Sequence, residues 1–154
     1  MITFDIYTPL SDNEAERTER TIMPTLIEAE RPKVERWIRK VAAGYGFHVG
    51  DLHYIFCTDE QELAVNRQFL GHDYYTDVIT FDYSTPSVLS GDIFISLDTV
   101  RSNAEEVGTD FDHELRRIIV HGLLHLTGQA DKTPETKAQM TAKEENALSM
   151  YHQL

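Results

Sequence analysis

The chain has only one cysteine, Cys57, and no long uninterrupted run of apolar residues. A single cysteine excludes an internal disulfide and gives no indication of an oxidising compartment. No apolar stretch approaches the roughly 20 residues that cross a bilayer as a helix, and the first residues lack the basic start and apolar core of a signal peptide. We therefore expect a cytoplasmic protein without a membrane partner.

Positive charge is also scarce, since 14 Lys and Arg residues face 26 Asp and Glu residues, giving a formal net charge of -12. A uniformly negative field repels a polyanion, so broad phosphate binding is excluded, DNA is not expected and any RNA contact must be local. Basic residues are concentrated in the segment 31–40, which we call the basic helix: Arg31, Lys33, Arg36, Arg39 and Lys40. This segment is either a solvated helix face or a phosphate contact.

The hydrophobic content of 41% over 154 residues is sufficient for one globular domain, which we assign to residues 1–154. Apolar periodicity and turn residues predict strands at 2–7, 52–57, 78–81 and 93–95, and helices at 32–44, 58–71, 98–107, 110–127 and 134–151. We expect Pro32 in a first helical turn, Thr58 and Gln61 in a capping box, and Asp98 as an N-cap. The order of these elements predicts an α+β fold with a mixed four-stranded sheet.

Two histidines give the sequence its clearest chemical signal. His121 and His125 stand four residues apart in the apolar helical segment 115–126, so their rings project from one face of a buried helix. Two imidazoles at this spacing can share one metal ion, as in the metal helix of zincin peptidases. The alternative is a pair of satisfied core histidines.

Asp131 is the expected third ligand. Gly128 ends the helix in a position that favours a left-handed turn, and Asp131 follows three residues later, so the chain can return its carboxylate to the histidines. Three protein ligands leave a position for water, which is typical of catalytic zinc sites. The sequence therefore predicts a metal site, with zinc or another divalent transition metal, at the end of a central helix; Asp131 could instead be a loop or cap residue.

A zincin peptidase carries a general-base glutamate directly after its first histidine, and here that position is Gly122. Peptide hydrolysis of that kind lacks its proton acceptor, so a peptidase is a minor alternative. Two histidines and a carboxylate also bind iron in non-haem oxygenases, but those enzymes usually place their ligands on a β-barrel. The metal helix is therefore expected to serve other chemistry.

Several segments resemble the YbeY family of metal-dependent endoribonucleases and ribosomal RNA maturation factors. They are residues 66–69, Thr-Asp-Val-Ile-Thr-Phe at 76–81, Gly-Asp-Ile-Phe-Ile-Ser at 91–96 and His-Gly-Leu-Leu-His-Leu-Thr-Gly at 121–128, in the family's order. The resemblance implies a single-strand endoribonuclease acting in 16S rRNA maturation and ribosome quality control. Its implied partners are single-stranded RNA, in particular ribosomal RNA, together with the small ribosomal subunit and its associated proteins.

The chain departs from the family pattern at two positions. The family's third histidine ligand falls on Asp131, and a shifted alignment would instead place Lys132 there, which cannot bind metal when protonated. The family's cleft arginine falls on Leu70, and Arg67 lies one turn earlier on the same helix face as a substitute or as an ordinary surface residue.

The remaining assignments follow from these motifs. Catalysis is expected through water held at His121, His125 and Asp131, with Asp77 as a further catalytic candidate and with His113 and Glu114 as candidates for orienting ligands or moving protons. RNA contacts are expected at Arg67, Arg36, Arg39 and Lys40. The main rival is a non-catalytic, metal-stabilised ribosome assembly factor, favoured by the acidic charge and by Leu70.

Overall fold

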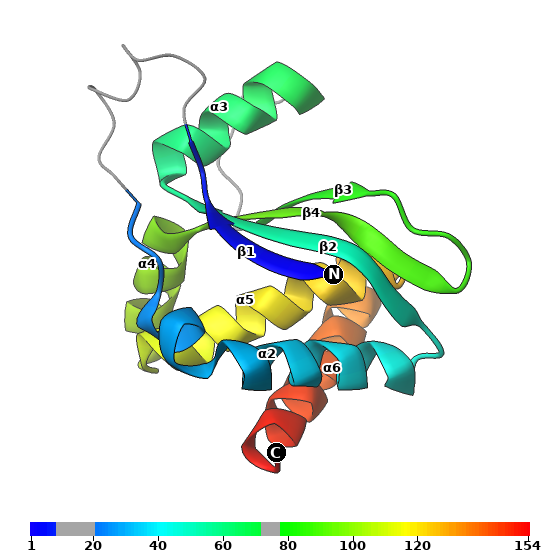
Figure 1. Cartoon of the computed structure of the whole chain (residues 1–154). Coiled ribbons are helices and arrows are strands. Elements are labelled where there is room, and N and C mark those ends of the chain that lie inside the picture. Colours follow the sequence, from blue (N-terminus) through cyan, green and yellow to red (C-terminus); the bar gives the residue numbers. More distant parts are fainter. Residues whose placement is uncertain (9–20, 72–77) are drawn as a thin grey trace.

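The computed structural model describes residues 1–8, 21–71 and 78–154 (Figure 1). Over these residues the elements follow the predicted order of strand, helix, strand, helix, two strands and three helices. The strands are β1 (Ile2–Ile6), β2 (His48–Cys57), β3 (Val78–Asp82) and β4 (Val88–Ser96), and the helices are α2 (Thr25–Gly44), α3 (Asp59–Leu70), α4 (Leu97–Val107), α5 (Phe111–Leu126) and α6 (Pro134–His152). The predicted α+β class is confirmed.

The four strands form one mixed sheet in the order β1-β2-β4-β3. Strands β1, β2 and β4 are parallel, and β3 pairs antiparallel with β4 at one edge, which confirms the predicted mixed sheet. Helix α3 lies on one face of the sheet, whereas α2, α5 and α6 lie on the other (Figure 1). The second face therefore holds the main core.

Helix α5 is the centre of that core because its second half, from Ile118 to Leu126, is apolar apart from the two histidines. Leu115, Ile118, Ile119, Leu123 and Leu124 on it are fully buried. The buried Tyr54 hydroxyl of β2 donates a hydrogen bond to the Ile119 carbonyl (3.1 Å), and Trp37 of α2 donates to the Ala147 carbonyl of α6 (2.7 Å). These buried polar contacts fix the sheet, α2 and α6 around the metal-helix candidate.

The ends of α5 follow the sequence signals closely. Asp110 is its N-cap and accepts a hydrogen bond from the His113 amide (2.7 Å). The helix ends at Leu126, and Gly128 adopts a positive φ of 98°, as predicted for the turn that follows. Thr58 and Gln61 likewise form the expected capping box of α3.

Two predicted helix starts were wrong. Helix α2 begins at Thr25 and not at the predicted Pro32. Pro32 lies inside the helix and is accompanied by a kink, with Glu30 non-helical at φ -127° and ψ 21°, because proline disrupts the turn before it without ending the helix. Ser96, not Asp98, caps α4 by accepting from the Thr99 amide. The Asp98 carboxylate is engaged elsewhere, since it accepts a hydrogen bond from the backbone amide that opens α3.

In the part of the chain that the structure describes, the helices are too short or too polar to traverse a lipid bilayer.

Candidate metal centre

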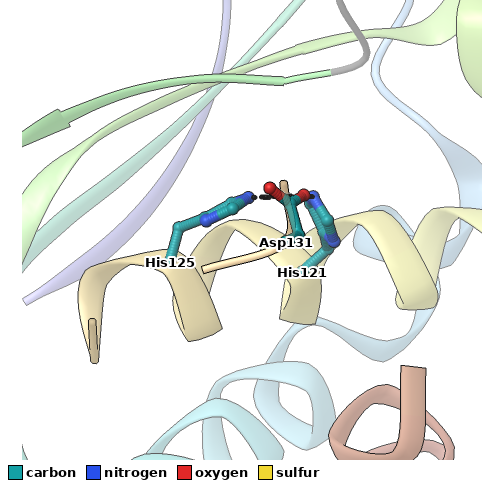
Figure 2. Close-up of side chains that lie close together, drawn as sticks. All are labelled: His121, His125 and Asp131. Atoms are coloured by element: carbon teal, nitrogen blue, oxygen red, sulfur yellow. Dashed lines mark hydrogen bonds and ion pairs between the residues drawn. The ribbon is translucent and has the colours of Figure 1, made fainter. Parts of the chain in front are cut away.

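The two histidines of α5 point toward one another from adjacent turns (Figure 2). Their ring centroids are 4.6 Å apart with planes at 88°, and the two Nε2 atoms are separated by 3.1 Å. The His121 side chain is 8% exposed and the His125 side chain 25% exposed. The helical spacing thus places both rings at the boundary between the core and solvent.

Asp131 reaches the same point from the turn after α5 (Figure 2). Its Oδ2 atom lies 3.5 Å from Nε2 of His121 and 3.3 Å from Nε2 of His125. The positive φ of Gly128 reverses the chain so that the carboxylate returns over the histidine pair. We call His121, His125 and Asp131 the acceptor cluster.

Each histidine is oriented through its other ring nitrogen. Nδ1 of His125 lies 3.0 Å from the Gln129 carbonyl oxygen, and Nδ1 of His121 lies 2.6 Å from Oε2 of Glu144. Carbonyl oxygens and ionised carboxylates only accept hydrogen bonds, so both Nδ1 atoms donate. Both Nε2 atoms consequently carry lone pairs directed at the cluster.

The three converging atoms fit a metal ion. A tetrahedral ion with ligand bonds of about 2.0–2.2 Å separates neighbouring ligand atoms by roughly 3.3–3.6 Å. The observed separations are 3.1, 3.3 and 3.5 Å. Three acceptor atoms that face one another need a shared proton or a cation between them. Their spacing, with two nitrogen ligands and one oxygen ligand, matches a divalent transition metal.

A buried ionic network stands behind His121. Glu144 of α6 accepts from His121 and pairs with Arg117, whose Nη1 is 3.2 Å from Oε1 of Glu144, and Arg117 also binds both carboxylate oxygens of Glu114. Burial alone would lower the pKa of Arg117, but hydrogen bonds and charge attraction from the two glutamates outweigh it and raise that pKa above its usual value. Arg117 is therefore a permanent cation between two carboxylates.

Glu144 was missed in the sequence, although a signal for it was present. The buried residues of α6 recur at helical spacing, and Glu144 occupies that buried face four residues after Met140 with an exposed fraction of 4%. A carboxylate on the apolar face of a helix requires a buried partner. Glu114, named only as one of several candidates, joins the network through Arg117, whereas His113 lies in the first turn of α5, two turns before His121.

Gly122 explains why the metal helix lacks the zincin glutamate. A Cβ atom at this position would lie 2.8 Å from Cγ2 and 3.3 Å from Cδ1 of Ile93, and 3.5 Å from Cγ2 of Val78. The flank on which a zincin places its general base is therefore packed against strands β3 and β4. A side chain at this position therefore requires Ile93 to shift.

The residues expected to bind RNA are not gathered in one place. Arg36, Arg39 and Lys40 are exposed on α2, and Arg67 is exposed in the last turn of α3, on the opposite face of the sheet (Figure 1). Leu70, at the end of α3, is 40% exposed. Asp77 lies outside the described residues.

The fold and the acceptor cluster define the class of the molecule: a small α+β protein with a candidate metal site on a His-x-x-x-His helix. Comparison with known proteins is more specific. The family model for Endoribonuclease YbeY matches residues 14–152, so the chain belongs to the YbeY family, as its motifs indicated.

Individual relatives agree with this assignment. Proteins named Endoribonuclease YbeY from Bacteroides thetaiotaomicron and Phocaeicola vulgatus are each 52% identical over 134 residues, which is 87% of this chain and 96% and 95% of theirs. The solution structure of TM1509 from Thermotoga maritima is similar with a TM-score of 0.61 at 25% identity, covering 98% of this chain and 89% of that one.

Proposed function

We propose that the protein is a metal-dependent endoribonuclease that cleaves single-stranded RNA. The observation that carries this proposal is the convergence of Nε2 of His121, Nε2 of His125 and Oδ2 of Asp131 within a chain of the YbeY family. Its relatives bear the name of endoribonucleases. The acceptor cluster provides the kind of site that such chemistry requires.

Zinc is the proposed metal, held by His121, His125 and Asp131. When bound, a divalent ion of this kind supplies positive charge for a phosphate oxygen and makes water more acidic. The side chains of His125 and Asp131 are 25% and 31% exposed, so the cluster is open to a substrate on that side. On the opposite side of the cluster, the His121 and Glu144 side chains are only 8% and 6% exposed, so that side is closed.

We place this activity in 16S rRNA maturation and ribosome quality control, with the small ribosomal subunit and its associated proteins as partners and the cytoplasm as location. The support is membership of the YbeY family and the bacterial origin of the relatives. Single-stranded RNA is favoured over duplex because a strongly acidic surface disfavours extended contact with two phosphate backbones.

The test compares the wild-type protein with a His121→Ala, His125→Ala double variant purified in parallel. We expect slow cleavage of a single-stranded RNA oligonucleotide by the wild type, little cleavage of the matching duplex, and loss of cleavage with chelator or in the double variant. The double variant controls for contaminating ribonuclease. Equal cleavage by both proteins would refute the proposed catalysis.

A second candidate is a non-catalytic, metal-stabilised ribosome assembly factor, favoured by the apolar Leu70 at the place of the family arginine. This function predicts that the wild type binds metal and ribosomal RNA but leaves the RNA intact. A zincin-like peptidase is disfavoured by the packing of Gly122 against Ile93.

A further inference from the structure

We infer that Glu144 is a positioning residue that sets the tautomer of His121 for metal binding, and that Arg117 fixes the orientation of the Glu144 carboxylate. This inference rests on the proposed metal-dependent function and assigns a role to α6, which contributes no atom to the acceptor cluster. Glu144 is 4% exposed, and its Oε2 lies 2.6 Å from Nδ1 of His121.

The two ends of the Glu144 carboxylate face partners of the same kind. Oε2 accepts from His121, and Oε1 accepts from Nη1 of Arg117 at 3.2 Å. Both partners are donors, so an ionised carboxylate, which offers acceptors at both ends, satisfies the position completely. An isosteric amide offers an acceptor at one end only.

Arg117 cannot turn away from Glu144 without a further loss. Its Nε lies 2.7 Å and 3.0 Å from the two oxygens of Glu114, which is 2% exposed, and its Nη2 also bonds to Glu114. Breaking a buried ion pair of this kind leaves an uncompensated charge. Donors and acceptors therefore alternate in a fixed order along the network: His121 and Arg117 donate, and Glu144 and Glu114 accept.

The network also sets the local charge. Glu114 and Arg117 offset one another, so Glu144 supplies one negative charge on the buried side of His121, while Asp131 supplies another on the open side. A carboxylate bonded to Nδ1 makes Nε2 a stronger ligand. The two carboxylates together balance the charge of a divalent cation.

A Glu144→Gln substitution isolates this role because the side chain keeps its size. Arg117 donates, so the amide oxygen must face Arg117 and the amide NH₂ group must face His121. Nδ1 of His121 then has to accept, which moves its proton to Nε2 and removes the lone pair that a metal needs. His125 is unaffected, since its Nδ1 is held by a backbone carbonyl.

The first measurement is imidazole ¹⁵N NMR of the metal-free protein at about pH 9, well above the ordinary histidine pKa of about 6.5. We expect both His121 and His125 of the wild type to carry the proton on Nδ1. In Glu144→Gln only His121 should switch to the Nε2–H form. The exposed neighbour Glu145, changed to Gln, removes the same charge from α6 and should alter neither ring.

The second measurement is Zn²⁺ affinity by chelator competition on the same proteins. Loss of a partner that orients a metal-binding histidine typically costs 10–100-fold in affinity, and we expect a loss in that range for Glu144→Gln and none for Glu145→Gln. Unfolding curves of both variants check that they fold.

The outcomes separate this inference from the proposed function. A wild-type His121 found in the Nε2–H form, which requires no variant to fold, would overturn the inference, as would an unchanged tautomer and unchanged Zn²⁺ affinity in folded Glu144→Gln. A wild type with the expected tautomer but without RNA cleavage would overturn the nuclease proposal and leave the role of Glu144 in metal binding standing.

Discussion

A Cβ atom on Gly122 would approach Cγ2 of Ile93 to 2.8 Å, so the metal helix and strand β4 meet where one residue has no side chain. The β-branched Ile93 is fully buried and stiff at χ1, so its Cγ2 can move away only by an unfavourable side-chain rotation or by a shift of the strand. This close approach sets the distance between α5 and the sheet, and thereby the position of His121 and His125 relative to the sheet.

Gly122→Ala should therefore lower the free energy of unfolding. Overpacking costs about 1–3 kcal/mol, whereas alanine gains only about 1 kcal/mol over glycine in a helix, so a net loss of up to about 2 kcal/mol is expected in chemical denaturation. Gly44, in the last turn of α2, has nothing within 4 Å of its Cβ position. Gly44→Ala should be neutral or stabilising, and equal effects of the two substitutions would contradict this account.

Cys57 should make the fold less stable at alkaline pH. Burial, followed by the charges of Glu62, Asp59 and Asp98, raises the pKa of its thiol, so the folded state keeps the proton when the unfolded state releases it. Above the ordinary pKa of 9.0 the unfolded state binds fewer protons, and the free energy of unfolding falls as pH rises. At pH 10 this contribution should reach about 1.4 kcal/mol.

The measurement compares denaturation of the wild type and Cys57→Ala at pH 7 and pH 10. The variant is expected to be less stable at pH 7 because it leaves a cavity, and the gap should narrow at pH 10, since other titrating groups are common to both proteins. A gap that is independent of pH would show that the thiol does not contribute.

Local signals predicted the metal helix better than its surroundings. The signals for this helix each span only a few residues: the N-cap Asp110, the turn residue Gly128 and the four-residue spacing of the histidines. The structure contains the helix start and the left-handed turn that they predicted. The starts of α2 and α4 were misassigned because competing signals exist nearby. Asp98 is a residue type favoured at N-caps, but its carboxylate accepts a hydrogen bond from the backbone amide of Asp59, 39 residues away in sequence.

Long-range partners account for what the sequence could not provide. The parallel pairing of β2 with β4 and the contact of Glu144 with His121 depend on how elements pack, which periodicity alone does not specify. Periodicity shows that Glu144 lies on a buried face, but not which residue it meets. The part of the site that faces α6 was therefore found only in the structure.

The basic helix and Arg67 offer a test of which face of the sheet RNA follows. Arg36, Arg39 and Lys40 are exposed on α2, and each lost phosphate contact should reduce the slope of log affinity against log salt by roughly 0.7 for a single strand. We expect the Arg36→Ala, Arg39→Ala, Lys40→Ala variant to show this reduction in titrations with single-stranded RNA.

Arg67→Ala tests α3 on the opposite face in the same titration. A reduced slope for the triple variant alone assigns RNA to the α2 face, and an unchanged slope for the triple variant would exclude the basic helix. The variants control for one another, because all of them remove positive charge from exposed positions.

Leu70→Arg should increase RNA cleavage by placing a positive charge where the resemblance to the YbeY family implies an arginine. A preorganised contact to developing charge is worth about 2.7–4 kcal/mol at oxyanion sites, which corresponds to roughly 10²–10³ in rate and sets an upper limit here. Leu70 is 40% exposed, so the substitution should be tolerated. Val107→Arg adds the same charge at another exposed helix end and should leave the rate unchanged; an equal increase would indicate a nonspecific charge effect.

Asp131 provides the most direct test of the acceptor cluster. Its Oδ2 is 3.3–3.5 Å from both histidine Nε2 atoms, so Asp131→Ala removes one of three converging ligand atoms. Loss of a direct ligand should cost more than the 10–100-fold typical of a partner outside the ligand set, and we expect Zn²⁺ affinity to fall by more than about 100-fold in chelator competition. Asp131→His supplies the ligand type that the family resemblance implies and should retain binding, since both imidazole and carboxylate are common zinc ligands.

Lys132→Ala is the matched control, because Lys132 is the adjacent exposed residue and the ligand position in the shifted alignment. A protonated lysine has no lone pair for a metal, so this substitution should leave Zn²⁺ affinity unchanged. Full affinity and stoichiometry in Asp131→Ala would show that the carboxylate is not a ligand, and that the chain's departure from the third histidine leaves only His121 and His125 to hold the ion. Reduced affinity in Asp131→Ala together with unchanged affinity in Lys132→Ala would instead establish the aspartate as the replacement for that histidine.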